Sequence, residues 1–164
     1  MTDADRTTST SAVTTERLHA ATPFARTLAI EVLDVDDRHA LLRLPARDDL
    51  ANHVGGPHAG AIFTLGEAAA AVLMLQRFGD WMDRAVPLAV SASIEWSRLA
   101  RSSVTAQATM DDATEDVAER VRTQLAAGER PEWTTTVVLR REQDGEECAR
   151  MTVLLTLKPL APNP

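Results

Sequence analysis

A single acidic residue interrupts the most apolar stretch of this 164-residue sequence. Glu67 is the only charged residue between His58 and Arg77. Burying an isolated carboxylate is costly unless the group is paired or neutralised, and a carboxyl in such surroundings is a candidate acid, base or nucleophile. A structural role, in an arginine pair or as a neutral hydrogen-bonded core residue, is the alternative interpretation.

The loop before this stretch is suited to binding a negatively charged oxygen. Residues 52–60 read Asn-His-Val-Gly-Gly-Pro-His-Ala-Gly, and a helix that begins where they end leaves its first backbone N–H groups without partners. The N–H groups of Ala59 and Gly60, together with the helix dipole, suit the developing oxyanion of an acyl carbonyl. The alternative is that Gly55, Gly56 and Gly60 only permit a tight turn and close packing.

Residues 59–75 are rich in Ala, Leu and Met, which favour helix, and they are apolar on every side. A helix without a polar face is expected to be covered by other elements. Ala59 and Glu67 are eight positions apart, which is about 12 Å of axial rise, so one chain alone would struggle to place both on one carbonyl. We therefore predict a homodimer, or a dimer of two such dimers, in which two antiparallel helices form composite sites.

Alternation of apolar and polar residues predicts an antiparallel sheet around that helix. The predicted strands are 27–35, 40–44, 88–96, 104–110, 133–141 and 148–157, and a short surface helix is predicted within 111–127. The predicted fold class is α+β, a curled sheet that holds one long helix in its concave face. We expect a single domain over 16–158, a disordered leader at 1–15 and a disordered tail at 159–164.

Composition argues against several functional classes. The chain has 17 Lys and Arg against 24 Asp and Glu, a formal net charge of −7, so a nucleic-acid partner is not expected. Its one cysteine, Cys148, leaves no intramolecular disulfide and favours a reducing, cytoplasmic location. The four histidines lack metal-ligand spacing, and no stretch reaches the roughly 20 uncharged apolar residues of a membrane span. We therefore predict neither a metal nor a membrane partner.

The loop and the helix together resemble a known family. The matching residues are Asn52, Gly55, His58, Ala59, Gly60 and Glu67. They resemble the signature of hotdog-fold acyl-CoA thioesterases of the phenylacetic-acid-degradation type. The resemblance implies the hotdog fold and a thioester hydrolase whose substrate carries the CoA moiety, with no further cofactor.

The resemblance also implies roles for the matching residues. Ala59 would supply the oxyanion N–H beside His58, Asn52 would place the thioester or water, and Glu67 would be the general base or the nucleophile. Two residues depart from the usual pattern. Ala59 replaces a glycine, which adds a methyl group beside the acyl group, and Glu67 replaces the commoner aspartate, which lengthens the reach by one methylene.

Further residues are assigned to substrate binding. Ser91 and Ser93 are candidates for a polar residue that faces the site from the strand after the helix, although their alternation with apolar neighbours equally fits ordinary outward positions. Arg98 and Arg101 are the nearest candidates to meet the CoA phosphates. Gly55, in the loop, is assigned to substrate binding with them.

Two other functions stay open. His53 and Glu67 lie fourteen positions apart, similar to the His and Glu of hotdog-fold acyl-thioester dehydratases, in which the pair transfers protons while water is eliminated. The same cleft could instead bind an acyl-CoA without turnover. Release of a free thiol would indicate the thioesterase, formation of an enoyl-CoA the dehydratase, and tight binding without turnover the third function.

Overall fold

The structure is a computed structural model that describes residues 3–110 and 116–160. Two helices, α1 (Asp3–Ala21) and α2 (Pro23–Thr27), precede the sheet. The strands are β1 (Glu31–Val35), β2 (His39–Leu44), β3 (Ala85–Trp96), β4 (Val104–Met110), β5 (Glu132–Arg141) and β6 (Glu147–Pro159). The other helices are α3 (Ala59–Phe78) and α4 (Val117–Ala126), and two short 3-10 turns are η1 (Asp48–Leu50) and η2 (Gly79–Trp81).

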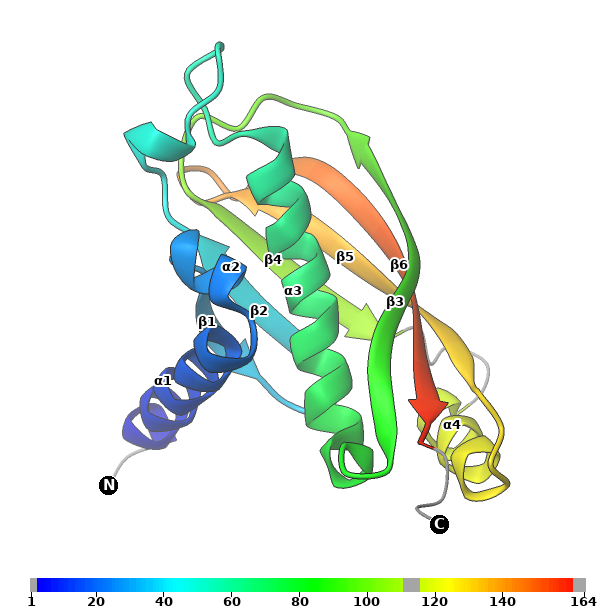
Figure 1. Cartoon of the computed structure of the whole chain (residues 1–164). Coiled ribbons are helices and arrows are strands. Elements are labelled where there is room, and N and C mark those ends of the chain that lie inside the picture. The colour runs from blue at the N-terminus through cyan, green and yellow to red at the C-terminus, as the bar shows by residue number, and fades with distance from the viewer. Residues whose placement is uncertain (1–2, 111–115, 161–164) are drawn as a thin grey trace.

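The six strands form one antiparallel sheet with the order β1-β2-β4-β5-β6-β3. The sheet curls around α3, which lies across its concave face (Figure 1). β1 and β3 are the two edge strands. The predicted α+β architecture, a curled antiparallel sheet around one long helix, is confirmed.

The apolar composition of α3 is explained by its position against the sheet. Leu65 and Leu73 are fully buried, and a Cβ at Gly66 would lie 2.6 Å from Met151 Sδ on β6, so helix and sheet are in close contact there. The helix continues beyond the predicted end to Phe78. By length and composition Ala59–Trp81 could cross a membrane, but 56% of its most apolar window is buried inside the protein, as expected of a core helix.

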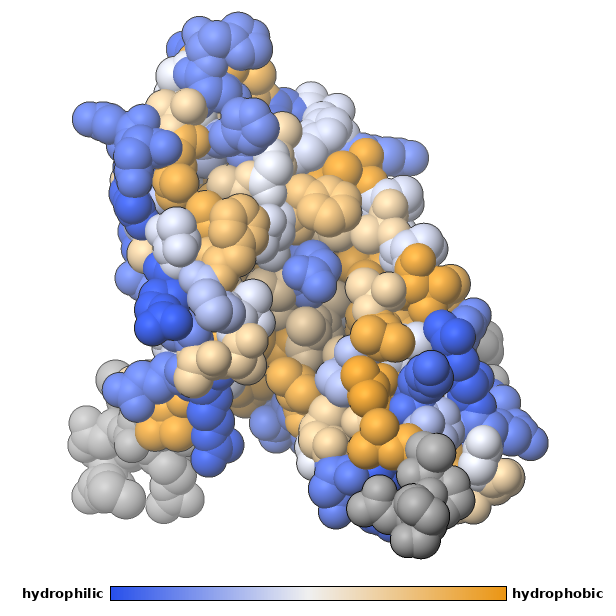
Figure 2. All heavy atoms as spheres, in the orientation of Figure 1, coloured by the Kyte–Doolittle hydropathy of each residue, from blue (hydrophilic) through white to orange (hydrophobic). Residues whose placement is uncertain are grey.

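Two largely apolar surfaces are left uncovered in the single chain. One side of α3, from Glu67 through Ala71 to Leu75, is half-buried or exposed. The edge strand β3 is exposed along most of its length, and its large side chains Leu88 and Val90 are among the exposed apolar residues. Figure 2 shows hydrophobic surface gathered along β3 and in the hollow over α3.

The N-terminal segment differs from the disordered leader predicted for 1–15. Residues from Asp3 onward belong to α1, which packs along β1, one of the two edge strands of the sheet. The Ser11 hydroxyl donates to the Leu33 carbonyl at 2.9 Å, and the Val32 N–H donates to Thr15 Oγ1 at 2.9 Å. These side chains satisfy backbone groups of an edge strand, which a helix without an apolar stripe can do. The prediction of a leader rested on the Thr- and Ser-rich composition of residues 1–15, and residues of these two types make both hydrogen bonds.

The ends of two other predicted segments also differ. The strand predicted from residue 27 begins only at Glu31, because α2 and the turn that follows it precede the strand. β6 includes Pro159, the first residue of the predicted tail, and residues 161–164 lie outside the described part of the chain.

The surface helix predicted within 111–127 corresponds to α4, and residues 111–115 lie outside the described part of the chain. Asp116 Oδ1 accepts a hydrogen bond from the Glu119 N–H at 3.1 Å and so caps the start of α4. Gly128, whose φ is +77°, lies just beyond its end.

Candidate functional site

The N-terminus of α3 presents one free backbone donor. His58 is the N-cap residue, and its Nδ1 accepts a hydrogen bond from the Gly60 N–H at 3.0 Å. Among the described residues, no hydrogen bond engages the Ala59 N–H. Of the two donors predicted for an oxyanion, Ala59 is therefore available, whereas Gly60 already has a partner. His58 acts here as a helix cap, for which its Nδ1 must be unprotonated.

The loop before α3 is held closed by the side chain of Asn52. Asn52 Oδ1 accepts from the Val54 N–H at 3.0 Å and from the Gly56 N–H at 3.3 Å, and its Nδ2 donates to the Pro57 carbonyl at 3.3 Å. Gly55 occupies the left-handed region with φ +77°. Asn52 thus fixes the loop that leads into α3. Its Oδ1 and one N–H of Nδ2 are used by the loop backbone, and, within the described residues, the second N–H of Nδ2 is left for the placement of substrate or water that the resemblance implies.

A close contact ties this loop to the segment between β3 and β4. A Cβ built on Gly56 would lie 1.8 Å from the backbone oxygen of Ala100. Only glycine permits this approach, and the contact sets the position of the loop relative to residues 97–101.

Glu67 lies on the uncovered side of α3, two turns from its N-terminus. The side chain is half-buried, and within the described parts of the chain no hydrogen bond or ion pair engages its carboxylate. Burial raises the pKa of the Glu67 carboxyl above its ordinary value, because desolvation disfavours the charged form. An ion pair between Glu67 and an arginine, the structural role considered as an alternative, is therefore not found among the described residues.

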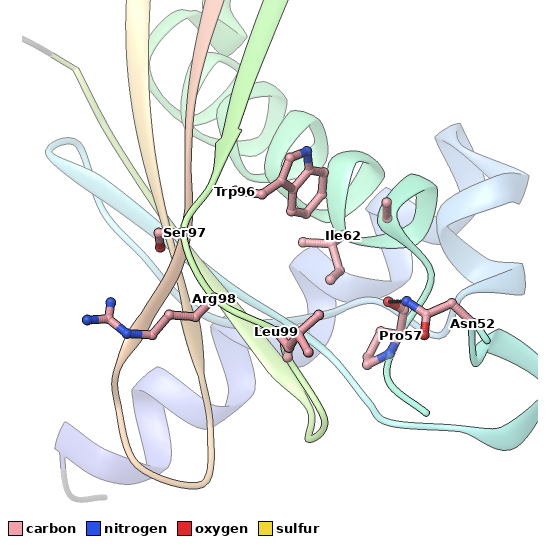
Figure 3. A pocket seen from close by; sticks show the side chains of 9 residues that line it. Asn52, Pro57, Ile62, Trp96, Ser97, Arg98 and Leu99 are labelled. Carbon is pink, nitrogen blue, oxygen red and sulfur yellow. Dashed lines mark hydrogen bonds between the residues drawn. The ribbon is translucent and has the colours of Figure 1, made fainter. Parts of the chain in front are cut away.

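A pocket of about 410 Å³ lies where the end of β3 meets the start of α3. Asn52 and Ala59 line one side, and Trp96, Arg98 and Leu99 line the other. Figure 3 shows Trp96, Ile62 and Leu99 pointing into the space, whereas the Arg98 guanidinium extends away from Asn52. The pocket therefore combines an apolar lining with one free N–H at the positive end of a helix.

A second hollow of about 350 Å³ adjoins the first, because Arg98 and Leu99 line both. Arg101 and Arg141 also line it. Arg141 forms an ion pair with Asp144 at 2.9 Å, and Arg98 donates to the Glu147 carbonyl at 3.1 Å. The predicted pair Arg98 and Arg101 is thus brought together. Arg141 was not predicted as a site residue, because only the fold brings the end of β5 to this place.

The two predicted serines do not face α3. Cross-strand partners share a face of the sheet, and Ser93 pairs with Thr152, whereas the neighbouring Ile94 pairs with Met151, the residue in contact with α3. Ser91 pairs with Leu154, on the same outer face as Thr152. Ser91 and Ser93 therefore turn away from the helix that carries Glu67.

The single chain brings some predicted residues together and leaves others apart. Asn52, Ala59 and Arg98 line one pocket, but Glu67 does not line it. His53, the residue of the dehydratase alternative, is exposed and lines neither that pocket nor its neighbour. In the ranges 3–110 and 116–160, no group of His, Cys, Asp and Glu side chains is arranged to hold a metal ion.

Comparison with known proteins identifies the family. The domain family DUF4442, a domain of unknown function, matches residues 10–157. The chain belongs to the DUF4442 family. No curated protein sequence matches the chain.

Solved structures share the fold over almost the whole chain. A Pseudomonas aeruginosa protein of unknown function, described as a probable thioesterase, is 22% identical with a TM-score of 0.78, and the match covers 91% of this chain and 95% of that one. A candidate thioesterase from Shewanella oneidensis is 17% identical, with a TM-score of 0.73 and coverage of 91% and 97%. A thioesterase family protein from Silicibacter pomeroyi is 18% identical, with a TM-score of 0.67 and coverage of 92% and 99%. At these identities the likeness establishes the fold, which is the hotdog fold.

Proposed function

We propose that the protein is an acyl-CoA thioesterase, similar to the phenylacetic-acid-degradation type, whose active site is completed by a second copy of the chain. The observation that carries the proposal is the Glu67 carboxylate, half-buried on an uncovered helix face without a partner among the described residues. Thioesterase descriptions of three structural neighbours support the same activity class.

The exposed apolar surfaces support a homodimer. β3 is an edge strand with unpaired backbone groups on one side, and it carries exposed Leu88 and Val90. An exposed apolar edge of this length is a template for pairing with another strand. Pairing of two β3 strands would continue the sheet and bring the uncovered faces of two antiparallel α3 helices toward each other, with the Glu67 of each chain facing the α3 N-terminus of the other.

The reaction proposed for this site is hydrolysis of the thioester. The carbonyl oxygen accepts a hydrogen bond from the Ala59 N–H of one subunit, at the positive end of α3. Glu67 of the partner subunit takes a proton from water, whose oxygen bonds to the carbonyl carbon. The carbon–sulfur bond then breaks, and the leaving thiolate takes the proton from the glutamate, which gives a free acid and free CoA. Direct attack by the carboxylate, followed by hydrolysis of the anhydride, would give the same products.

The raised pKa of Glu67 suits this role. A general base works best when its pKa lies near the working pH, and burial moves a carboxyl in that direction. His58 and Asn52 then serve as positioning residues. His58 caps the helix that offers the Ala59 N–H, and Asn52 holds the loop that precedes it.

The three arginines at the second hollow supply a place for the CoA phosphates. Arg98, Arg101 and Arg141 line one depression that adjoins the proposed carbonyl site. Guanidinium groups bind phosphate oxygens by charge-assisted hydrogen bonds. On a chain with a net charge of −7, such a local cluster would offset the general repulsion of a polyanionic substrate.

The direct test is thiol release from a panel of short, long and aromatic acyl-CoAs by wild-type protein and by Glu67→Gln. We expect kcat to fall about 100-fold or more in Glu67→Gln, whereas Glu119→Gln, on the surface helix α4, should leave it unchanged. Cys148 is 1% exposed, so a thiol reagent reports the released CoA. Turnover of Glu67→Gln at the wild-type rate would refute the assignment of Glu67, and acyl-CoA binding by wild-type protein without thiol release would refute the hydrolase.

A further inference from the structure

A third pocket, of about 240 Å³, lies between α1 and α3, away from the N-terminus of α3. Its lining is mainly apolar. The apolar residues are Leu18 and Ala21 of α1, Val35 of β1, and Ala71, Val72 and Leu75 of α3. Figure 1 shows α1 and α2 on one side of α3 and β3 on the other, so α1 forms the wall of this pocket that is farther from β3.

The pocket adjoins the candidate catalytic residue on the same helix. Ala71 and Leu75 follow Glu67 by four and eight positions, and residues at this spacing lie on one face of an α-helix. Ala71 is therefore about one turn, or about 6 Å along the axis, from Glu67. A ligand whose reacting carbon lies at Glu67 can extend along this face into the pocket of the same subunit.

We propose that the pocket between α1 and α3 binds the apolar acyl group of the thioester substrate. This inference rests on the proposed thioesterase function and names the substrate class as thioesters of apolar acyl groups. The described residues of the α3 wall of the pocket carry no charged group. The polar lining residues are Thr14, Arg17, Thr22 and Gln76, of which Arg17 and Gln76 are exposed. A charged or strongly polar acyl group would lose its hydration there without gaining a buried partner.

The volume of the pocket between α1 and α3 limits the size of the acyl group that it can hold. Complete small-molecule sites usually occupy roughly 300–1,000 Å³, so a pocket of about 240 Å³ takes part of a ligand. An apolar cavity of roughly 150 Å³ is large enough for benzene. The pocket therefore fits a phenyl-sized ring with a short linker or a medium-length alkyl chain, whereas the CoA part stays outside, toward the arginines.

The inference gives α1 a function beyond covering the sheet edge. Leu18 and Ala21 belong to a helix that is held on β1 by the polar side chains of Ser11 and Thr15. The outer wall of the acyl pocket is thus a separate element, attached to the sheet by hydrogen bonds. Substitutions in α1 should change which acyl groups fit, without touching the groups that perform hydrolysis.

The test measures binding of non-hydrolysable thioethers, S-ethyl-CoA and S-octyl-CoA, by isothermal titration calorimetry. Wild-type protein should bind S-octyl-CoA at least about tenfold more tightly than S-ethyl-CoA, since each buried methylene contributes about fourfold. Ala21→Phe, which fills the pocket, should abolish that difference. Ala20→Phe is the matched control, because Ala20 is exposed and adjacent in sequence but does not line the pocket. Circular dichroism checks that each variant is folded.

Leu75→Ala provides a second variant, on the other wall of the pocket. Leu75 is 40% exposed in the single chain but lies on the α3 face that the proposed dimer covers, so sedimentation velocity first checks that Leu75→Ala keeps the wild-type oligomeric state. The enlarged pocket should then shift the preference toward longer alkyl chains. An octyl advantage that persists in Ala21→Phe, or its absence in wild-type protein, would overturn the inference. Thiol release from acyl-CoAs, measured in parallel, reports on the proposed function separately. A length preference that Ala21→Phe abolishes, in a protein that releases no thiol, would leave the pocket assignment standing and refute the hydrolase.

Discussion

Replacement of Gly56 by alanine tests whether the loop contact positions the candidate site. The added Cβ would lie 1.8 Å from Ala100 O and 2.9 Å from Ala100 C. Both are backbone atoms, so no side-chain rotation relieves the clash. The two loops must separate by about 1.6 Å to restore an ordinary contact of 3.4 Å. Overpacking of this kind costs about 2–3 kcal/mol, which corresponds to a loss of about 5–10 °C in Tm for a chain of this size.

The separation should also reduce activity. Residues Asn52 and Ala59 lie on one side of the contact and Arg98 on the other, and all three line the same pocket. A shift of about 1 Å at a reacting centre can cost roughly 100-fold in rate. We therefore expect kcat/KM for an acyl-CoA to fall between about tenfold and 100-fold in Gly56→Ala, measured by thiol release at a temperature well below the lowered Tm.

Gly79→Ala is the matched control for this experiment. Gly79 follows α3 with φ −58°, and a Cβ there would meet nothing within 4 Å. Alanine at such a position should be neutral or stabilise the protein by about 0.4–1 kcal/mol. If the Tm and kcat/KM of Gly56→Ala match those of Gly79→Ala, the loop contact does not position the site and the reasoning is wrong.

Two further outcomes follow from the structure. Burial raises the folded-state pKa of Glu67 above its ordinary value of 4.5, so the folded protein holds this proton more tightly than the unfolded chain does. The wild type therefore loses stability as the pH rises from the unfolded-state pKa of Glu67 through its folded-state pKa. The free energy of unfolding of Glu67→Gln, measured with denaturant, should therefore exceed that of the wild type by more at about pH 8 than at about pH 4. An equal difference at the two pH values would contradict a buried carboxylate without a compensating partner. Val90→Lys, on the β3 edge, should convert a dimer to monomers in sedimentation velocity, whereas Val13→Lys on α1, at similar exposure, should not. A wild-type chain that is monomeric at micromolar concentration, or a dimer that survives Val90→Lys, would argue against pairing through this edge.

Local patterns in the chain predicted most of the fold. The run of Ala, Leu and Met from residue 59 predicted α3, and strict alternation over 104–110 predicted β4 with the same ends. These elements follow from periodicity because each buries one continuous set of apolar side chains. The N-terminal helix had no such pattern. Its contacts with β1 run through Ser11 and Thr15, whose residue types are equally common in disordered segments.

The candidate site was predictable in its chemistry and not in its hydrogen bonding. The isolation of Glu67 in an apolar helix could be read from the residue types around it. Its half-buried carboxylate, without a partner among the described residues, agrees with that interpretation. The occupation of the Gly60 N–H by His58, and of the Asn52 amide by its own loop, required three-dimensional geometry. The Gly60 N–H had been assigned to the oxyanion from its place at the start of the helix, and Asn52 had been assigned to substrate or water from the family resemblance.

The sequence by itself determined the long apolar helix, the place of one carboxylate on it and the alternating strands that enclose it, because these depend on residues a few positions apart. Tertiary structure alone decided which groups remain available to a ligand. It brought Arg141 to Arg98 and Arg101, turned Ser91 and Ser93 to the outer face, and set α1 against α3 to form an apolar pocket. These outcomes depend on the packing of segments that lie tens of residues apart, and that packing leaves no periodic signal in the chain.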